Sequence, residues 1–264
     1  MLICRLTVAL LAASLSCGDG KPLPEPPHRI VSLAPNLTEM VTTLGAADRL
    51  AAVTPFCKAP STIPRLPGGM LADPEAILGF SPDLVLCSPM TPEGTRRQLA
   101  SLGLHVEVIA TPSLEAIRSE TQRMAALLGV KAPPMEISHA AAPGPTAALL
   151  FGADTGYSAA RGSHAHEILE GAGWRNVAAD AASPWPQLGE EFLLEKDPEI
   201  LVIADSGGSR REDIMAALRR HPLRSHLRAV RSGHVIILPA EAFTVPGPSV
   251  LETASKLRAA LKSQ

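Results

Sequence analysis

Two glutamates of this 264-residue chain stand at the head of matching segments. Glu75 begins EAILGFSPDLVL and Glu191 begins EFLLEKDPEILVI, and a proline follows each glutamate seven positions later. A carboxylate in the first turn of a helix is favoured by the helix dipole, and it forms charge-assisted hydrogen bonds with guanidinium groups. For either glutamate alone, an ordinary solvated helix start is the alternative. As a pair, they predict two similar lobes with one exposed carboxylate each.

Other residues that could do chemistry lack the necessary spacing. His164 and His166 are two positions apart, which on a helix separates their directions by about 200°, and a zinc site needs more ligands nearby. GADTG follows a predicted strand without a Walker lysine, and neither Ser32 nor Ser88 lies in a nucleophile elbow. We therefore predict no enzyme activity and no metal site. His164 alone is either an axial ligand for haem or cobalt, or an exposed residue at a helix start.

The composition is that of a globular protein. Hydrophobic residues make up 46% of the chain, aromatic residues 3%, and the formal net charge is −2. Such a chain is long enough to bury one large or two modest cores. A basic stripe with interleaved aromatic residues is missing, so nucleic acid is not an expected partner.

The N-terminus is typical of an export signal. The apolar run from Leu6 to Leu15 is too short to span a bilayer, so residues 1–16 are predicted to be a signal peptide. The run ends in SLSC, which resembles the lipobox of bacterial lipoproteins, although leucine is usual where the first serine stands. This resemblance implies lipidation of Cys17, with plain secretion as the alternative. The Pro-rich residues 17–28 are predicted to be a tether.

Strand-like and helix-like segments alternate along the rest of the chain, which indicates parallel sheets flanked by helices. Asn36 is expected to cap the first helix with Glu39 completing a capping box, and Asp73 to cap the second. Thr91 is expected to cap the third. The arginine-rich stretch LRRHPLRSHLRAVRSGH is predicted to be a solvated helix and loop. Strands are expected at 29–33, 49–55, 83–88, 105–110, 148–152, 176–178, 199–204 and 234–239, and helices at 36–45, 72–80, 91–103, 113–129, 163–173, 189–196, 211–221 and 248–262.

The repeated pattern predicts two Rossmann-like α/β lobes, residues 29–130 and 147–264, joined by residues 131–146. Prolines at 134 and 143 leave room for at most eight helical residues in this connection, or about 12 Å. A ligand crevice is expected between the lobes, at the carboxyl ends of the strands. The residues expected there are Pro35, Asn36, Thr54–Cys57, Ser88–Met90, Asp154–Tyr157 and Glu241–Phe243.

Two cysteines, Cys57 and Cys87, remain in the predicted lobes. In an exported protein they either form a disulfide or stay as two inert thiols. Pairing requires Cα atoms within about 7 Å, and the sequence leaves both possibilities open.

Three segments carry a resemblance to a known family. RIVSLAPNLTEMVTTLG, DPEAILGFSPDLVL and SPWPQLGEEFLLEKDPEILVI resemble, in this order, the substrate-binding proteins of ABC importers for cobalamin, haem and iron siderophores. The cobalamin receptors are most similar, through SPWPQ and the glutamate six residues after its tryptophan. The resemblance implies a periplasmic or extracytoplasmic, lipid-anchored monomer that binds its ligand between two lobes. It also implies docking onto a permease dimer in the inner membrane through Glu75 and Glu191.

The same resemblance implies ligand-binding residues. Trp185 matches the PWPQ motif, Tyr157 matches an aromatic position in a loop, and Phe56 matches another more loosely. Glu241 is what remains of a charged pair, and Asn36 follows the first strand. Aromatic faces suit a corrin or porphyrin plate, so the ligand is expected to be cobalamin or another tetrapyrrole, with no resident cofactor. The alternative for Trp185 and Tyr157 is that each side chain packs in the core and anchors its own loop.

The chain departs from the family at three places. A tryptophan of the cobalamin receptors would fall near Gly69 and is missing, Val245 stands where an arginine is expected, and the usual long interlobe helix is replaced by the short connection. A haem or ferric-siderophore receptor is therefore an alternative. Further alternatives are a metal-assisted enzyme on the same two-lobed frame and a sensor that has lost transport.

Overall fold

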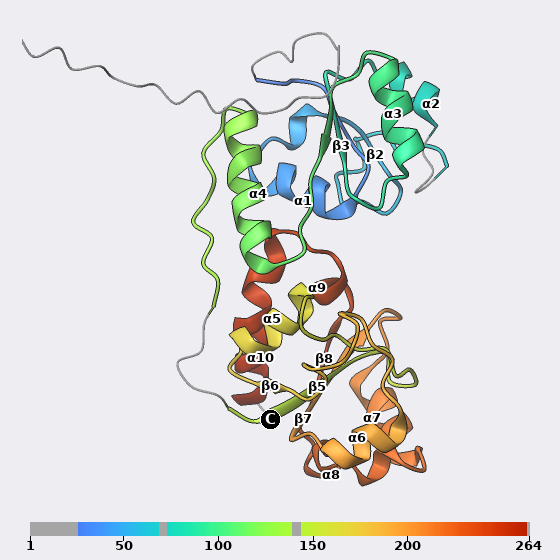
Figure 1. The fold of residues 1–264 in the computed structure, drawn as a ribbon, viewed down its shortest axis with the longest axis vertical. Helices are drawn as coiled ribbons and strands as arrows, with labels where there is room; N and C mark the ends of the chain where they lie inside the picture. The colour runs from blue at the N-terminus through green and yellow to red at the C-terminus, as the bar shows by residue number, and fades with distance from the viewer. Residues whose placement is uncertain (1–25, 69–72, 139–143, 263–264) are drawn as a thin grey trace, which may run out of the picture.

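The computed structural model describes residues 26–68, 73–138 and 144–262. Two four-stranded sheets organise the chain, in the orders β2-β1-β3-β4 and β6-β5-β7-β8, and every strand pair is parallel. Figure 1 shows the two sheets in separate lobes, one above the other. The strands are β1 (Ile30–Ser32), β2 (Leu50–Val53), β3 (Leu84–Cys87), β4 (Val106–Val108), β5 (Thr146–Phe151), β6 (Arg175–Asn176), β7 (Ile200–Asp205) and β8 (Val235–Pro239).

Helices flank both sheets, and the predicted two-lobed α/β fold is confirmed. Besides the expected helices, the structure has two short ones, α8 and α9, and three 3₁₀ turns. The helices are α1 (Pro35–Thr43), α2 (Pro74–Gly79), α3 (Glu93–Ser101), α4 (Leu114–Leu127), α5 (His164–Gly171), α6 (Glu190–Lys196), α7 (Arg211–Arg220), α8 (Arg228–Ser232), α9 (Glu241–Thr244) and α10 (Thr253–Lys262), with 3₁₀ turns η1 (Ala47–Arg49), η2 (Arg224–His226) and η3 (Pro248–Glu252).

The sequence repeat corresponds to a repeat in backbone geometry. Glu75 and Glu191 are the second residues of α2 and α6. Six positions after them, Ser81 (φ 48°) and Asp197 (φ 36°) are the non-glycine residues of the described chain that have positive φ. Each precedes a proline, which disfavours the α-helical region for the residue before it. Both helices therefore end in the same way before the next strand begins.

The first turns of the helices differ in part from the sequence predictions. Asp73 caps α2 as expected, because its Oδ1 accepts a hydrogen bond from Glu75 N at 3.1 Å. The prediction that Asn36 caps α1 is wrong: α1 begins one residue earlier at a proline, which is favoured at the first helical position. The Asn36 side chain donates instead to Thr111 Oγ1, at 3.2 Å. Thr91 does not cap α3 either, since Pro92 is still extended (ψ 137°) and the helix begins at Glu93.

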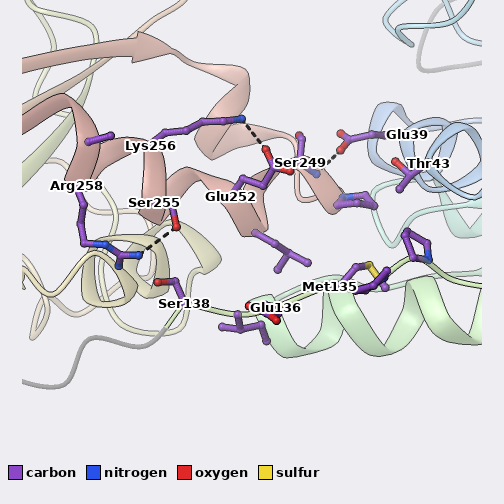
Figure 2. A pocket seen from close by; sticks show the side chains of 16 residues that line it. Glu39, Thr43, Met135, Glu136, Ser138, Ser249, Glu252, Ser255, Lys256 and Arg258 are labelled. Atoms are coloured by element: carbon purple, nitrogen blue, oxygen red, sulfur yellow. Dashed lines mark hydrogen bonds and ion pairs between the residues drawn. The ribbon is translucent and has the colours of Figure 1, made fainter.

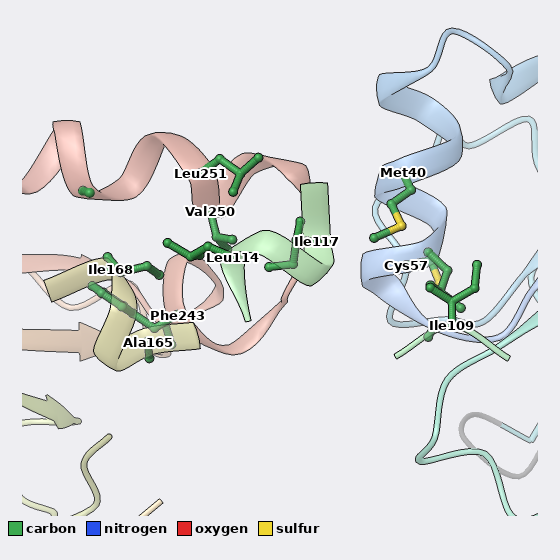
Figure 3. Close-up of a cluster of buried hydrophobic side chains, with 14 of the residues drawn as sticks. Met40, Cys57, Ile109, Leu114, Ile117, Ala165, Ile168, Phe243, Val250 and Leu251 are labelled. Carbon is green, nitrogen blue, oxygen red and sulfur yellow. The ribbon is translucent and has the colours of Figure 1, made fainter. Parts of the chain in front are cut away.

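One buried apolar cluster runs through both lobes. It includes Met40 and Ile109 of the first lobe, Leu114 on α4, and Ile168 and Phe243 of the second lobe. In Figure 3, Leu114, Ile168 and Phe243 lie together, and Met40, Cys57 and Ile109 form a second group. Trp174 is 4% exposed and belongs to this core. A continuous core indicates that the two lobes are packed together and not joined by the connection alone.

Polar contacts also cross between the lobes. The Glu167 carboxylate accepts a hydrogen bond from Leu114 N at 2.6 Å, at the start of α4. Glu39, expected in a capping box, accepts instead from Ser249 N at 2.5 Å. The capping-box prediction is therefore wrong, because this carboxylate holds the first turn of η3.

The described part of the connection between the lobes has no spanning helix, as predicted. No helix or strand is assigned from Lys131 to Ser138, and the segment runs beside α4 in Figure 1. Prolines at 133 and 134 explain this, since proline removes backbone donors that a helix needs. Among the described helices, none has the length and apolar character needed to cross a membrane.

Cys57 and Cys87 are both buried and free, so the disulfide alternative is not realised. Burial raises the pKa of the Cys87 thiol to about 11. Both thiols have almost no contact with solvent, which agrees with the alternative of two inert thiols.

Candidate functional site

A cavity of about 620 Å³ lies between the lobes. Its first-lobe wall is built from the segments that follow all four strands of the first sheet, as predicted for parallel strands. Its second-lobe wall is formed by the start of α5, the loop before α6 and the segment at the end of α9. The sequence predicts Asp154–Tyr157 and Glu241–Phe243 there instead. The lining residues are Leu33–Asn36, Thr54, Phe56, Ser88–Thr91, Ile109–Pro112, Gly162–His164, Pro184, Trp185, Thr244 and Pro246.

The cavity lining carries no Asp, Glu, Lys or Arg among the described residues. Its polar side-chain groups are hydroxyls, one carboxamide (Asn36), one imidazole (His164) and the indole N–H of Trp185. Such a wall offers neutral hydrogen-bonding groups within a mostly apolar surface, and the volume falls within the range of about 300–1,000 Å³ usual for ligand pockets.

Aromatic rings enter the cavity from both lobes. Trp185 is 45% exposed, and its ring lies 5.9 Å from Phe151 and 5.6 Å from His164, the latter in an edge-to-face arrangement. Phe56 lines the first-lobe side and is 61% exposed. Met90, which the sequence placed at a strand end but not among the ligand-binding candidates, is 76% exposed in the same wall. These large exposed apolar side chains give the cavity a partly aromatic, apolar surface.

His164 is buried, which corrects the expectation of an exposed helix-start histidine. Its Nε2 lies 2.7 Å from the Phe243 carbonyl oxygen. Burial lowers the pKa of His164 below its usual value, so the ring is neutral at pH 7. Because a carbonyl only accepts, Nε2 carries the proton and Nδ1 keeps its lone pair.

Two predicted ligand-binding residues lie outside this cavity lining. Tyr157 is 55% exposed, and its backbone pairs with Gln187. Glu241 begins α9 and forms an ion pair with Lys58 at 3.1 Å, which joins the two lobes. Asn36 does line the cavity, with its amide held by Thr111. The ligand-binding roles of all these residues stay predictions.

Glu75 and Glu191 are exposed at equivalent positions of their lobes. Neither carboxylate makes an ion pair or hydrogen bond with another described residue. Both therefore remain available to a cation on a partner, and Figure 1 shows the helices that carry them, α2 and α6, in different lobes.

Comparison with known proteins finds similar sequences and similar structures. A family model described as periplasmic binding protein matches residues 135–242. The cobalamin-binding protein of Halobacterium salinarum is 26% identical over 252 residues, which cover 88% of this chain and 68% of the relative. The vitamin B12-binding protein of Photorhabdus laumondii is 25% identical over 248 residues, with 88% and 86% covered. A periplasmic heme binding protein from Pseudomonas aeruginosa superposes with a TM-score of 0.72 at 24% identity, covering 90% of this chain and 94% of the other.

This chain has the fold of a periplasmic binding protein. The resemblance inferred from the three sequence segments is thereby confirmed. In this fold the cavity described above is the space between the lobes, and α2 and α6 are the helices whose first turns carry the matched carboxylates.

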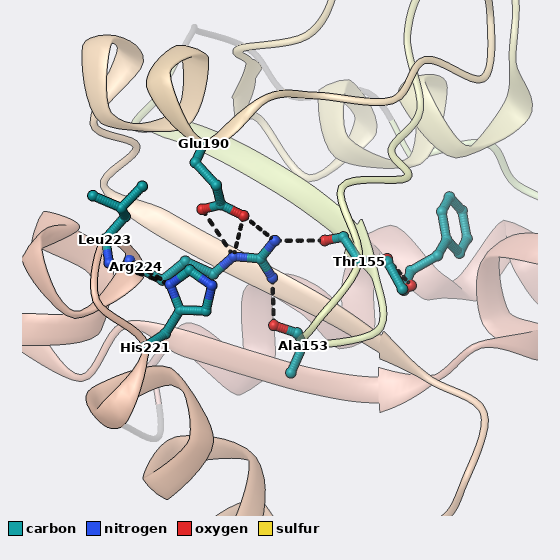
Figure 4. A network of polar contacts seen from close by, with 7 residues as sticks. Ala153, Thr155, Glu190, His221, Leu223 and Arg224 are labelled. Carbon is teal, nitrogen blue, oxygen red and sulfur yellow. Dashed lines mark hydrogen bonds and ion pairs between the residues drawn. The ribbon is translucent and has the colours of Figure 1, made fainter.

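Arg224 corrects the prediction that the arginine-rich stretch is wholly solvated. Its side chain is only 2% exposed and forms an ion pair with Glu190 at 2.5 Å. It also donates to the carbonyl oxygens of Ala153 and Thr155 (Figure 4). A buried guanidinium with this many acceptors is held in one position. No sequence motif around Arg224 predicts its burial.

The Arg224–Glu190 pair predicts a pH-dependent stability. The hydrogen bond from Arg224 lowers the pKa of Glu190 below its ordinary value of 4.5. The pair thus contributes its full stabilisation above about pH 4.5 and loses it as the pH falls through the lowered pKa. Glu190→Gln is expected to reduce the free energy of unfolding by about 1–3 kcal/mol at pH 7, as measured by urea denaturation. The difference from the unaltered chain should shrink at pH 3.5, and a difference that stayed constant would contradict this role of Glu190.

A larger hollow, of about 1070 Å³, lies where the connection passes between α1 and α10 (Figure 2). Much of its polar lining is paired internally: Lys256 contacts Glu252 at 3.3 Å, and Arg258 donates to Ser255 Oγ at 3.1 Å. Its groups do not converge on a common point, so we assign this hollow to the joint between the lobes. Among the described residues, no group of three or more His, Cys, Asp or Glu is arranged to hold a metal ion.

Proposed function

We propose that this protein is an extracytoplasmic substrate-binding protein, not an enzyme, that captures cobalamin or a related corrinoid and delivers it to an ABC permease. The observation that carries the proposal is the cavity between the lobes, which has aromatic walls and no charged residue among the described residues that line it. The two curated relatives named for cobalamin and vitamin B12 support the same ligand class.

The absence of charge from the described lining separates the candidate ligands. Haem has two propionates, and ferric siderophores of the catecholate type carry net negative charge, so both need cations when they are buried. The rim of a corrinoid carries neutral amide groups instead. Hydroxyls such as Thr54 and Thr111, together with the Asn36 amide, can exchange neutral hydrogen bonds with those amides. A charge-free wall therefore favours a corrinoid.

A haem or ferric-siderophore ligand is the second candidate, and His164 is the observation in its favour. A neutral imidazole whose Nε2–H is donated to a carbonyl has the arrangement usual for metal-ligating histidines. The fold shared with the periplasmic heme binding protein from Pseudomonas aeruginosa is consistent with this alternative. If haem is the ligand, adding hemin should shift its Soret band, and His164→Gln should abolish the shift.

Tryptophan fluorescence gives a direct experiment, because the chain contains two tryptophans and the other, Trp174, is buried. Trp174→Phe leaves Trp185 as the single emitter. Cyanocobalamin is expected to quench this emission along a saturable curve with one site per chain. Quenching that rises without saturation, as it does for free tryptophan, would argue against binding between the lobes.

Delivery to a permease is proposed to use Glu75 and Glu191. Each carboxylate is exposed, unpaired among the described residues and placed in the first turn of an equivalent helix. Charge-assisted bonds to arginine side chains of a permease dimer would fix the orientation of the bound protein more than they would raise its affinity.

We also propose that the protein is held at the membrane, as a monomer, by lipid on Cys17. This cysteine, the signal peptide 1–16 and most of the tether lie outside the described residues, as does Gly69. The family description assigns its members to the periplasm. Cys17→Ser is expected to move the protein from the membrane fraction to the soluble fraction of fractionated cells. An unchanged distribution would indicate another anchor or ordinary signal cleavage.

A further inference from the structure

The Arg224 guanidinium joins two segments that are far apart in the sequence. Its Nη2 donates to the carbonyl oxygen of Thr155 at 2.9 Å, and its Nη1 to that of Ala153. Its Nε lies 3.0 Å from a carboxylate oxygen of Glu190. Figure 4 shows these acceptors on opposite sides of one planar group. The turn after β5 and the first turn of α6 are therefore tied to the same buried side chain.

These two segments also flank the part of the chain that brings Trp185 to the cavity wall, which we call the Trp185 wall (residues 156–160 and 184–188). Residues 156–160 pair with residues 184–188 through backbone hydrogen bonds. Arg224 binds the turn just before the first segment and, through Glu190, the helix just after the second. The paired bonds are Leu188 N to Gly156 O (2.8 Å), Ser158 N to Pro186 O (2.9 Å) and Ala160 N to Pro184 O (2.9 Å).

Glu190 also sets the direction of its neighbour. Consecutive residues of an α-helix point about 100° apart, so Glu190 turned toward Arg224 leaves Glu191 directed outward, where it is exposed. In the first lobe the same helix start is fixed by the Asp73 cap. Gly189, at the cap position of α6, has no side chain for this purpose. The second lobe thus uses a buried ion pair where the first uses a capping carboxylate.

We propose that Arg224 is a positioning residue that holds the Trp185 wall and the Glu191-bearing turn of α6 in a fixed relation, so that the ligand wall and the docking carboxylate move as one unit. The inference rests on the proposed function, because it assigns Trp185 to the ligand and Glu191 to the permease. The arrangement itself is a property of the ligand-free chain, and it can be tested without a ligand.

The test is hydrogen–deuterium exchange of the ligand-free protein carrying Arg224→Lys. Lysine keeps the charge opposite Glu190 but lacks the planar fork that reaches both carbonyls. Exchange in residues 153–158 and 184–189 is expected to rise at least tenfold, with the first lobe and β7 unchanged. Arg228→Lys is the matched control, because Arg228 also bonds a carboxylate and a carbonyl, both of Asp197, but at the far end of α6. It should leave both segments unchanged.

Glu190→Gln is a second variant for the same experiment, in case Arg224→Lys does not fold. It keeps the carbonyl bonds of Arg224 and removes the ion pair, so the first turn of α6 should exchange faster while residues 153–158 stay protected. Unchanged exchange in either variant, or a uniform rise that includes β7, would overturn the proposal. Cyanocobalamin affinity, measured in parallel, should fall at least tenfold in Arg224→Lys. A chain that binds no cyanocobalamin at all would refute the proposed ligand and leave the exchange result to decide the positioning role.

Discussion

The double variant Glu75→Lys/Glu191→Lys is expected to abolish stimulation of the permease ATPase while it keeps the ligand affinity of the unaltered chain. Each substitution places an ammonium group against the arginine pocket proposed on the permease, where juxtaposed like charges cost several kcal/mol. The ligand cavity includes neither residue among its lining, so binding should not change. The measurement is ATP hydrolysis by the permease reconstituted in vesicles, together with ligand titration of each variant.

Glu212 supplies the matched control for this charge reversal. It is exposed in the first turn of α7 and makes no ion pair with another described residue. Glu212→Lys changes the net charge by the same amount as either single variant and should leave ATPase stimulation intact. Loss of ligand binding in Glu75→Lys, with stimulation retained, would show that the repeat has no docking role.

Trp185→Ala is expected to weaken corrinoid binding by about 1–3 kcal/mol, or roughly 5- to 150-fold in Kd, as for an aromatic side chain that anchors a ligand. The free protein should keep nearly the same thermal midpoint, because the side chain is 45% exposed before the ligand binds. Titration calorimetry and thermal unfolding of the same samples measure the two effects separately.

Trp174 is the control, because it is 4% exposed and packed in the core. Trp174→Ala should lower the thermal midpoint strongly, since truncation of a buried aromatic costs about 3–5 kcal/mol, and should leave the affinity of the folded fraction unchanged. A large loss of stability in Trp185→Ala with unchanged affinity would return Trp185 to the alternative role of a loop anchor.

The sequence predicts the fold because the helix-start residues and the repeated glutamate-to-proline spacing indicate the same helices and strands. Asp73 before a proline and a glutamate fixes the start of α2, and the glutamate-to-proline spacing fixes its end and the following strand in both lobes. Strand ends of the first sheet follow from the same pattern, and they account for the first-lobe wall, including Asn36 and Phe56.

The second-lobe wall could not be predicted in this way, because its partners are backbone atoms far along the chain. His164 is fixed by the carbonyl of Phe243, 79 residues away, and Arg224 by that of Ala153, 71 residues away. A backbone carbonyl leaves no mark in the sequence, so the sequence predicts neither the burial of His164, which it leaves as an axial ligand or an exposed residue, nor that of Arg224, which it places in a solvated stretch. Two adjacent residues, Pro35 and Asn36, both favour a helix start. Because the proline takes the first helical position, the prediction that Asn36 caps α1 is wrong.

Equilibrium dialysis of the unaltered chain against cyanocobalamin and hemin, each alone and then together, tests the central claim most directly. A neutral, aromatic-walled cavity predicts that one cyanocobalamin is retained per chain and that hemin does not displace it. Retention of hemin at one per chain, with cyanocobalamin passing freely across the membrane, would contradict the assignment of a corrinoid to this cavity.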